Sequence, residues 1–228
     1  MPCVCINQPI LISPITPGSL DVIYGTQDKS SSPYEGMYDY YYEYSYSVLF
    51  IDKSYLTGIP SGATINSFNF EVYNTGNGTY EENALTCYMA KAPSSYTQLP
   101  TNLRLNLSSV TDTAWNADVT PVFIGSGINT TYIQTSADPN RNWYPTFDVP
   151  TSFTYTSGTS LVISLNSKSG TYTPGTSSYP RWTGQVLSGT QPRIWCQDNR
   201  VPSQGAFVDT HVVNYNSTFR PNIRINYS

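Results

Sequence analysis

The chain contains one histidine, His211, in the segment FVDTHVVNY, and Asp209 precedes it by two residues. Residues two apart share a face of a strand, so the pair has two of the residue types of a Ser–His–Asp site. No G-x-S-x-G elbow or comparable nucleophile context accompanies the pair. A histidine in such surroundings is more typical of a packed or hydrogen-bonded strand residue. We therefore predict that the chain is not an enzyme and has no catalytic residue.

The acidic residues are candidates for glycoside hydrolysis, which needs two placed carboxylates. They are scattered through loop-like segments: Asp112, Asp118, Asp138, Asp148, Asp198, Asp209 and the neighbours Glu81 and Glu82. Their spacing predicts no pair, and we interpret them as solvated loop carboxylates. Calcium is an alternative, because hard oxygen donors stand at Asp138, Asn140, Asp198 and Asn199, but no EF-hand-like loop holds them. We expect no cofactor and no metal.

The four cysteines are Cys3, Cys5, Cys87 and Cys196. Cys3 and Cys5 lack the C-x-x-C spacing of zinc and redox sites, and one histidine is too few to complete a zinc site. Cys87 and Cys196 lie in strand-like runs, LTCYMA and RIWCQD. We interpret them as buried thiols, with a Cys87–Cys196 disulfide as the alternative.

The segment SSYPRWTG is the best local candidate for a glycan or partner contact. It places Tyr179, Arg181 and Trp182 together, with Tyr172 shortly before them. Sugar binding needs an exposed aromatic ring with polar neighbours, and this segment offers both. The competing interpretation, which we favour, is a loop that Trp182 anchors on the core.

Composition sets the class of fold that must position these residues. Of the 228 residues only 11% are charged, whereas 14% are aromatic, and a typical soluble domain has about 25% charged residues. Such a chain suits pleated strands and polar turns better than exposed helices. The net charge of −4 argues against nucleic-acid binding. No apolar run approaches the roughly 18 residues of a membrane-spanning helix, so no membrane partner is expected.

Period-2 alternation predicts several strands and the core between them. It is clearest in SFNFEVY, NWYPTFDV, SLVISLN and FRPNIRINY, where apolar residues occupy every second position. The predicted core includes Phe68, Phe70, Trp143, Phe147, Leu161, Ile163, Ile223 and Ile225. Pro221 indicates an edge strand or the first residues of a strand.

The segment EGMYDYYYEYSYSVLF contains six tyrosines between Tyr38 and Tyr46 and obeys the same rule. One side carries Tyr40, Tyr42, Tyr44, Tyr46, Val48 and Phe50. We predict an ordered strand whose inward face changes from tyrosine to aliphatic and phenylalanine side chains, because tyrosine rings pack well on a pleat. The pattern argues against a low-complexity spacer.

These elements predict an all-β, antiparallel two-sheet sandwich of jelly-roll type with almost no helix. Residues 20–228 form the single domain in this interpretation, and residues 1–19 form an extended, Pro-rich N-terminal arm. The arm is apolar, yet its three prolines make it a poor helix or central strand. We expect it to dock on another subunit through Ile6, Ile10, Leu11, Ile12 and Ile15. The alternative is that the arm fills a groove of its own sandwich.

Several segments, in order, resemble a β-sandwich module of surface proteins and bacteriophage structural proteins associated with Bacteroidetes and similar hosts. They include the Gly-Thr segment before the Tyr-rich strand, ATINSFNFEVY, LTCYMAKAPSSY, Trp115 before PVFIGSG, the block NWYPTFDVPTSFTYTSGTSLVISLNSKSGTY, and the closing RPNIRINYS. The resemblance covers roughly residues 20–228. It implies a jelly-roll-like fold used for adhesion or assembly and implies no catalytic residues.

The start of the sequence, MPCVCINQPILISPITPG, lacks the basic n-region of a secretory signal peptide. We therefore expect synthesis in a host cytoplasm and a place in the virion. The predicted function is a non-enzymatic structural protein of a bacteriophage, either a head decoration or fibre subunit or a tail or adaptor component. Its expected partners are other virion subunits in a homo-oligomer, with a host-surface glycan as a further partner. The alternative is a carbohydrate-binding or adhesin module of a bacterial cell surface.

Overall fold

The computed structural model describes residues 15–28, 44–73, 78–92, 95–99, 122–134, 142–168, 181–186, 195–200 and 219–228. Its strands are β1 (Gly18–Val22), β2 (Gln27–Asp28), β3 (Tyr44–Ile51), β4 (Thr64–Tyr73), β5 (Gly78–Ala92), β6 (Val122–Gln134), β7 (Asn142–Thr154), β8 (Ser160–Lys168), β9 (Arg181–Val186), β10 (Trp195–Arg200), β11 (Phe219–Pro221) and β12 (Ile223–Tyr227). The helical content of these residues is one 3-10 turn, η1 (Lys53–Tyr55). No helix in this part of the chain has the length and apolar character to cross a membrane.

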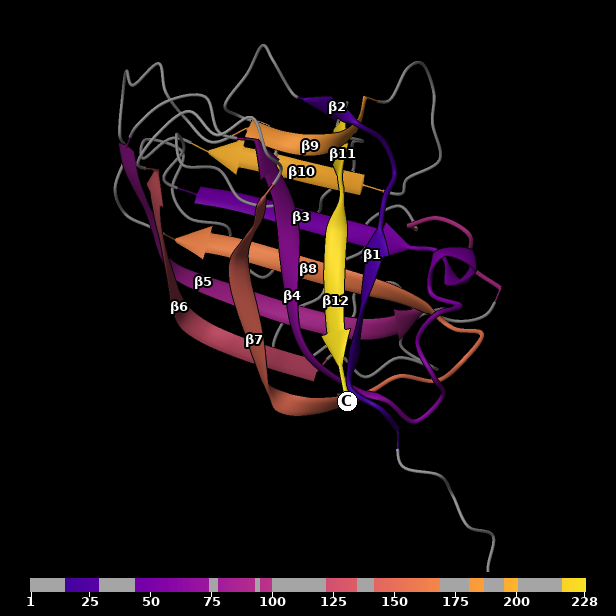
Figure 1. The fold of residues 1–228 in the computed structure, drawn as a ribbon. Coiled ribbons are helices and arrows are strands. Elements are labelled where there is room, and N and C mark those ends of the chain that lie inside the picture. The colour runs from indigo at the N-terminus through magenta and orange to yellow at the C-terminus, as the bar shows by residue number, and fades with distance from the viewer. Residues whose placement is uncertain are drawn as a thin grey trace, which may run out of the picture.

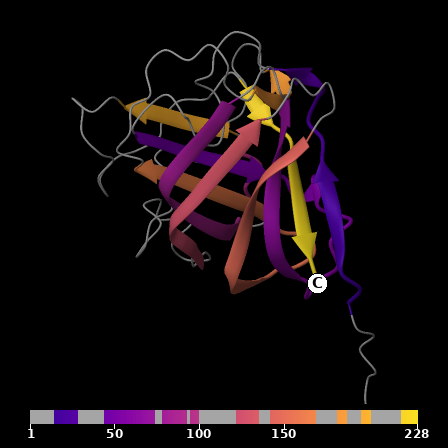
Figure 2. The ribbon, with the colours of Figure 1, turned by 60° about the vertical axis from the view of Figure 1, so that its left-hand side comes forward.

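The strands form two antiparallel sheets, as the sequence predicts. Sheet 1 follows the order β1-β12-β4-β9-β11, with β7 paired to β4 and β2 paired to β9; sheet 2 follows the order β10-β3-β8-β5-β6. In Figure 1, β7, β4, β12 and β1 lie in front of β3, β8 and β5, whose strands run across them, and Figure 2 shows the two layers from the side. The predicted all-β sandwich is confirmed.

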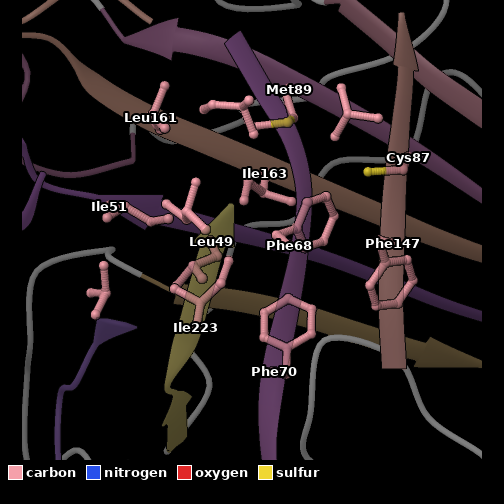
Figure 3. Close-up of a cluster of buried hydrophobic side chains, with 14 of the residues drawn as sticks. Leu49, Ile51, Phe68, Phe70, Cys87, Met89, Phe147, Leu161, Ile163 and Ile223 are labelled. Atoms are coloured by element: carbon pink, nitrogen blue, oxygen red, sulfur yellow. The ribbon is translucent and has the colours of Figure 1, made fainter. Parts of the chain in front are cut away.

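The core lies between the sheets and is built from the alternating positions of both. Phe68, Phe70 and Phe147 of sheet 1 pack against one another with ring centroids 5.0–5.9 Å apart. Figure 3 shows these rings facing side chains of sheet 2, among them Met89, Leu161 and Ile163. Seven of the eight predicted core residues belong to this cluster: Phe68, Phe70, Phe147, Leu161, Ile163, Ile223 and Ile225.

The eighth, Trp143, was predicted wrongly: it is half-buried on the outer face of sheet 1. The pairing of β4 with β7 explains the error. Asn69 lies opposite Thr146, but Glu71 lies opposite Trp143, so two steps along β4 match three along β7. An extra residue of this kind is a β-bulge, and it moves the following side chains to the other face. Pro145 lies within the irregular stretch and cannot donate a ladder hydrogen bond.

The Tyr-rich segment forms a strand from Tyr44 onward, but its inward face was also predicted wrongly. Leu49 and Ile51 belong to the core, whereas Val48 and Phe50 are buried outside this cluster, on the other side of the sheet. The pairing of β3 with β8 determines which side of β3 faces the core, because Leu49 lies opposite Ile163, which is a core residue. Tyr40 and Tyr42 lie outside the described residues.

The two sheets differ in their outer faces. On sheet 2 the outward positions of the central strands are buried: Val48, Phe50, Tyr88, Ala90, Val162 and Ser164. On sheet 1 the outward residues of β1 and β7 (Ser19, Asp21, Thr146 and Asp148) are exposed, whereas Asn69 and Glu71 of β4 are buried. The accessible sheet face of the described residues is therefore that of sheet 1.

The described chain starts at Ile15, within the predicted arm. Strand β1 already begins at Gly18, two residues before the predicted domain boundary. Ile15 packs against the core cluster of its own sandwich, so at this residue the arm follows the alternative interpretation. The other predicted arm contacts, Ile6, Ile10, Leu11 and Ile12, lie outside the described residues.

Candidate functional site

Asn222 stands where the C-terminal strands change partner. Strand β11 pairs with β9 up to Pro221, and β12 pairs with β4 from Ile223 onward. Between them, the backbone N–H of Asn222 donates to Thr183 O at 2.9 Å, and its carbonyl accepts from Glu71 N at 3.2 Å. The backbone N–H and C=O of Asn222 are therefore both hydrogen-bonded at the point where β11 passes into β12.

The side chain of Asn222 fixes the segment that follows β1. Its Oδ1 accepts from Tyr24 N at 2.7 Å and from Gly25 N at 3.2 Å, and its Nδ2 donates to Gly25 O at 2.7 Å. The same Nδ2 donates to Glu71 Oε2 at 2.6 Å. Gly25 has to be glycine, because a Cβ there would collide with Gly184 O. One buried amide therefore sets the position of Tyr24.

Arg220 lies directly over Tyr24, with its Cζ atom 3.7 Å from the ring centre. Its Nη2 donates to Gln185 Oε1 at 2.5 Å, whereas its buried Nε has no hydrogen-bond partner in the described part of the chain. Burial lowers the pKa of Arg220, and the neighbouring Tyr24 and Tyr55 side chains act in the opposite direction. The guanidinium is thus held by aromatic rings and an amide, without a described carboxylate.

Tyr55 extends this cluster to the surface. It lies on η1, whose N-cap Asp52 accepts from Ser54 N at 2.9 Å and so fixes the turn. The Tyr55 ring meets Tyr24 edge-on, with centroids 5.0 Å apart. Among the described residues, the exposed large hydrophobic side chains are Ile23 (46%), Tyr55 (41%) and Val186 (42%). Val186 lies opposite Phe219 of the core cluster and so points away from Arg220. We call Tyr24, Tyr55, Gln185 and Arg220 the Arg220 patch.

A second surface covers the outer face of sheet 1, where registered pairs place polar residues in two rows. The first row is Asp21, Arg224, Asn69 and Thr146, and the second is Ser19, Asn226, Ser67 and Asp148. Each row runs across β1, β12, β4 and β7, which lie side by side at the front of Figure 1. Trp143 lies opposite Glu71 next to the first row. We call these two rows with Trp143 the polar face.

Hydrogen bonds hold most of these side chains in fixed orientations. Asn69 Nδ2 donates to Thr146 Oγ1 at 2.7 Å. Asn226 Nδ2 donates to Ser67 Oγ at 2.9 Å and to Asn69 Oδ1 at 3.1 Å, which joins the two rows. The polar face is therefore a connected network and not a set of freely rotating side chains.

Arg224 links the two ends of the polar face. It makes a bidentate ion pair with Asp21, with N–O distances of 2.6 and 2.8 Å. Its Cζ also lies 4.5 Å from the ring centre of Trp143. The hydrogen bond to Asp21 raises the pKa of Arg224. The guanidinium is held from both sides and in turn holds the Trp143 ring in place.

The residues that the sequence singled out lie elsewhere. Trp182 is 3% exposed and packs edge-on against Phe70 at 5.6 Å, so it anchors β9 on the core and presents no ring to solvent. Arg181 lies in β9 opposite Tyr73. Tyr172 and Tyr179 lie outside the described residues.

Cys87 is a free, buried thiol, which confirms the interpretation as a small hydrophobic residue and contradicts a Cys87–Cys196 disulfide. Within the described ranges, no three His, Cys, Asp or Glu side chains gather to hold a metal ion. Asp198 and Asn199 lie in β10, whereas Asp138, Asn140, Asp209 and His211 lie outside the described residues.

The residues of both surfaces were missed as sites, although the sequence shows some of them as the polar side of a strand. Arg220, Asn222, Arg224 and Asn226 alternate with core residues in FRPNIRINY. Their partners lie about two hundred positions away: Asp21 is 203 residues from Arg224, and Tyr24 is 198 residues from Asn222. Only the pairing of the first and last strands brings them together. The regular spacing of four polar residues was the signal that could have identified this strand as a surface.

Comparison of the chain with protein-family models, curated proteins and solved structures finds no significant match.

Proposed function

We propose that this chain is a non-enzymatic structural protein of a bacteriophage virion, which acts through contacts with other subunits, including copies of itself. The Arg220 patch carries the proposal. Tyrosine and arginine are enriched at the energetic centres of protein interfaces. In this chain the exposed Tyr55 lies beside the buried Arg220 guanidinium, whose Cζ atom is 6.0 Å from the centre of the Tyr55 ring.

The chemistry of the patch indicates what a partner surface supplies. Arg220 has no described carboxylate partner, and burial disfavours its charge. An Asp or Glu of a neighbouring subunit would supply the missing charge, while its apolar side chains would cover the exposed Tyr55 ring. Such a contact removes apolar surface from water and strengthens the ion pair at the same time. The sequence resemblance to phage structural modules adds the virion as the place of assembly.

The N-terminal arm is a second assembly element in this proposal. Ile6, Ile10, Leu11 and Ile12 are apolar side chains in a Pro-rich segment, and burying one such side chain contributes about 1.5–3 kcal/mol. We propose that they dock on a neighbouring subunit, although Ile15 packs on its own sandwich. Deleting residues 2–14 should then weaken assembly and leave folding intact. Unchanged assembly after this deletion would remove the arm from the proposal.

The assembly contact can be tested by sedimentation of the purified chain. We expect concentration-dependent oligomers of the natural sequence, and a monomer of unchanged circular dichroism for the variant Tyr55→Ala. Lys53→Ala, on the same turn as Tyr55, is the matched control and should assemble normally. A natural chain that stays monomeric, or a Tyr55→Ala variant that assembles as well as the control, would contradict the role of the patch.

The place of assembly needs a separate measurement. Mass spectrometry of purified phage particles should find this chain in a fixed ratio to the other structural subunits, and particles should retain it after washing in high salt. Its absence from purified particles would contradict the virion proposal, whatever the oligomeric state of the isolated chain.

A further inference from the structure

We propose that the polar face binds a neutral glycan. This inference does not rest on the virion role, because it concerns a different surface and a different kind of partner. Sheet 2 has buried outward positions, so the open sheet face of the described structure is that of sheet 1. Its residues differ in kind from those of the Arg220 patch: amides, hydroxyls, carboxylates and one guanidinium beside a half-buried tryptophan.

The hydrogen-bond inventory of the face favours hydroxyl ligands. Thr146 Oγ1 accepts from Asn69, and Ser67 Oγ accepts from Asn226, so neither of these bonds uses the hydroxyl's own proton, which each group can donate to a ligand. Asn226 uses both Nδ2 protons within the network, which leaves its Oδ1 as an acceptor. A sugar hydroxyl both donates and accepts, and the face presents these two kinds of group next to each other.

The second row ends in a further acceptor, the carboxylate of Asp148, which is exposed beside Ser67 in the register of β4 and β7. In the first row, Arg224 uses Nε and Nη2 on Asp21, and its Nη1 remains as a donor. Neighbouring strands lie about 4.8 Å apart, so the groups of a row repeat at a spacing that equatorial hydroxyls on alternate carbons of one sugar ring can meet.

The arrangement is fixed before a ligand arrives. The amides of Asn69 and Asn226 and the guanidinium of Arg224 are each held by other side chains. A fixed site loses little side-chain freedom on binding, which matters for sugars because each of their hydrogen bonds replaces one to water. Trp143 supplies the apolar surface against which the C–H groups of a sugar ring can pack, and Arg224 holds this ring.

Charge and polarity separate a neutral glycan from other occupants. The described side chains of this face carry the carboxylates of Asp21 and Asp148 against the one guanidinium of Arg224. This balance disfavours acidic polysaccharides and nucleic acids. A protein partner would need a larger apolar centre in its contact than the single half-buried ring of Trp143.

Affinity electrophoresis tests the proposal with defined probes. The full chain is run in native gels that contain soluble starch, dextran, xyloglucan, galactomannan, arabinoxylan or mixed-linkage β-glucan, and in a gel without polysaccharide. We expect retardation by at least one of these neutral polymers and none by alginate, which is acidic. Retardation by none of the neutral polymers, or by alginate alone, would overturn the proposal.

Variants locate the binding on the polar face. Thr146→Ala combined with Asp148→Ala changes two exposed side chains, so the variant should fold, and we expect at least a tenfold loss of affinity for the retarding polymer. Trp143→Ala should give a similar loss. Lys53→Ala, on η1 and outside the polar face, is the control and should bind as the natural chain does. Equal retardation of the double variant and the control would place the site elsewhere and refute the inference.

Discussion

The side-chain amide of Asn222 donates to the carboxylate of Glu71 at 2.6 Å, and both side chains are buried at the point where β11 passes into β12. The other contacts of this amide hold the backbone of Tyr24 and Gly25. The pair thus joins β4, the segment after β1 and the C-terminal strands through one side chain.

Replacing Asn222 by alanine should destabilise the fold strongly. The change removes one donor from the buried Glu71 carboxylate and from the partly buried Gly25 carbonyl, and losing a hydrogen bond at such a group costs about 1–3 kcal/mol, more when the group is charged. We expect a loss of about 2–5 kcal/mol in urea unfolding. Asn226→Ala on the same strand is the control and should cost about 1 kcal/mol or less, because Asn226 is only half-buried. Equal losses for the two variants would contradict the role given to Asn222.

The two tryptophans described above should respond very differently to truncation. Trp182→Ala removes a ring from the core beside Phe70 and should cost about 3–5 kcal/mol. Trp143→Ala removes a half-buried ring from the outer face and a contact with Arg224, and such cation–π contacts contribute about 0.5–2 kcal/mol. We therefore expect a loss below about 2 kcal/mol. Thermal and urea unfolding of both variants decide the matter, and a reversed order would mean that the face of Trp143 is assigned wrongly.

The thiol of Cys87 should be unreactive in the native protein. Burial raises its pKa, so almost no thiolate exists at pH 8, and no reagent reaches the sulfur. The measurement uses a variant in which Cys3, Cys5 and Cys196 are serine and follows its reaction with a disulfide reagent. We expect a rate at least about a hundredfold lower in buffer than in 6 M guanidinium chloride. Rapid modification of the folded variant would contradict the burial of Cys87.

Tyr24→Phe should leave stability at pH 7 unchanged or slightly higher. The Tyr24 hydroxyl is buried and has no hydrogen-bond partner among the described residues, whereas its ring and the contact with Arg220 remain in the variant. Unfolding at pH 7 is the first measurement. A loss above about 1 kcal/mol would reveal a partner for this hydroxyl.

Alkaline pH should separate the same two proteins further. Burial raises the pKa of Tyr24 above the unfolded value of about 10. The contribution of this group is therefore complete below pH 10 and is lost as the pH rises toward the folded value. The midpoint of thermal unfolding should fall less between pH 9 and 11 in Tyr24→Phe than in the natural chain. Parallel curves would show that Tyr24 ionises freely in the folded state.

The strands and most of the core could be predicted from the sequence because their alternation survives in the fold. Period-2 alternation was sufficient to place Phe68, Phe70, Ile163 and Ile225 in the core. The inward face of β3 could not be predicted in this way, since both of its sides are buried there and alternation carries no preference. Its pairing with β8 decides the face.

The candidate surfaces could not be predicted because they depend on long-range pairing and on one irregularity. A bulge before Thr146 places Trp143 beside Arg224, and residue types alone do not predict a bulge. The polar rows exist because the first and last described strands lie next to each other. The segment around Trp182 has residue types suited to glycan binding, but its tryptophan ring is buried in the core.

The antiparallel pair of β1 and β12 also determines how the sandwich would respond to mechanical load. Gly18 lies opposite Tyr227 and Val22 opposite Ile223, so the chain enters β1 and leaves β12 at one corner, near the C-terminus marked in Figures 1 and 2. A force between these two ends would peel the strands apart from Gly18 upward, breaking their hydrogen bonds one after another. The separation of the strands would then reach Asn222, whose side-chain amide is hydrogen-bonded to Tyr24, Gly25 and Glu71. Tension on the two ends would thus release the first strand easily and be arrested at this side chain.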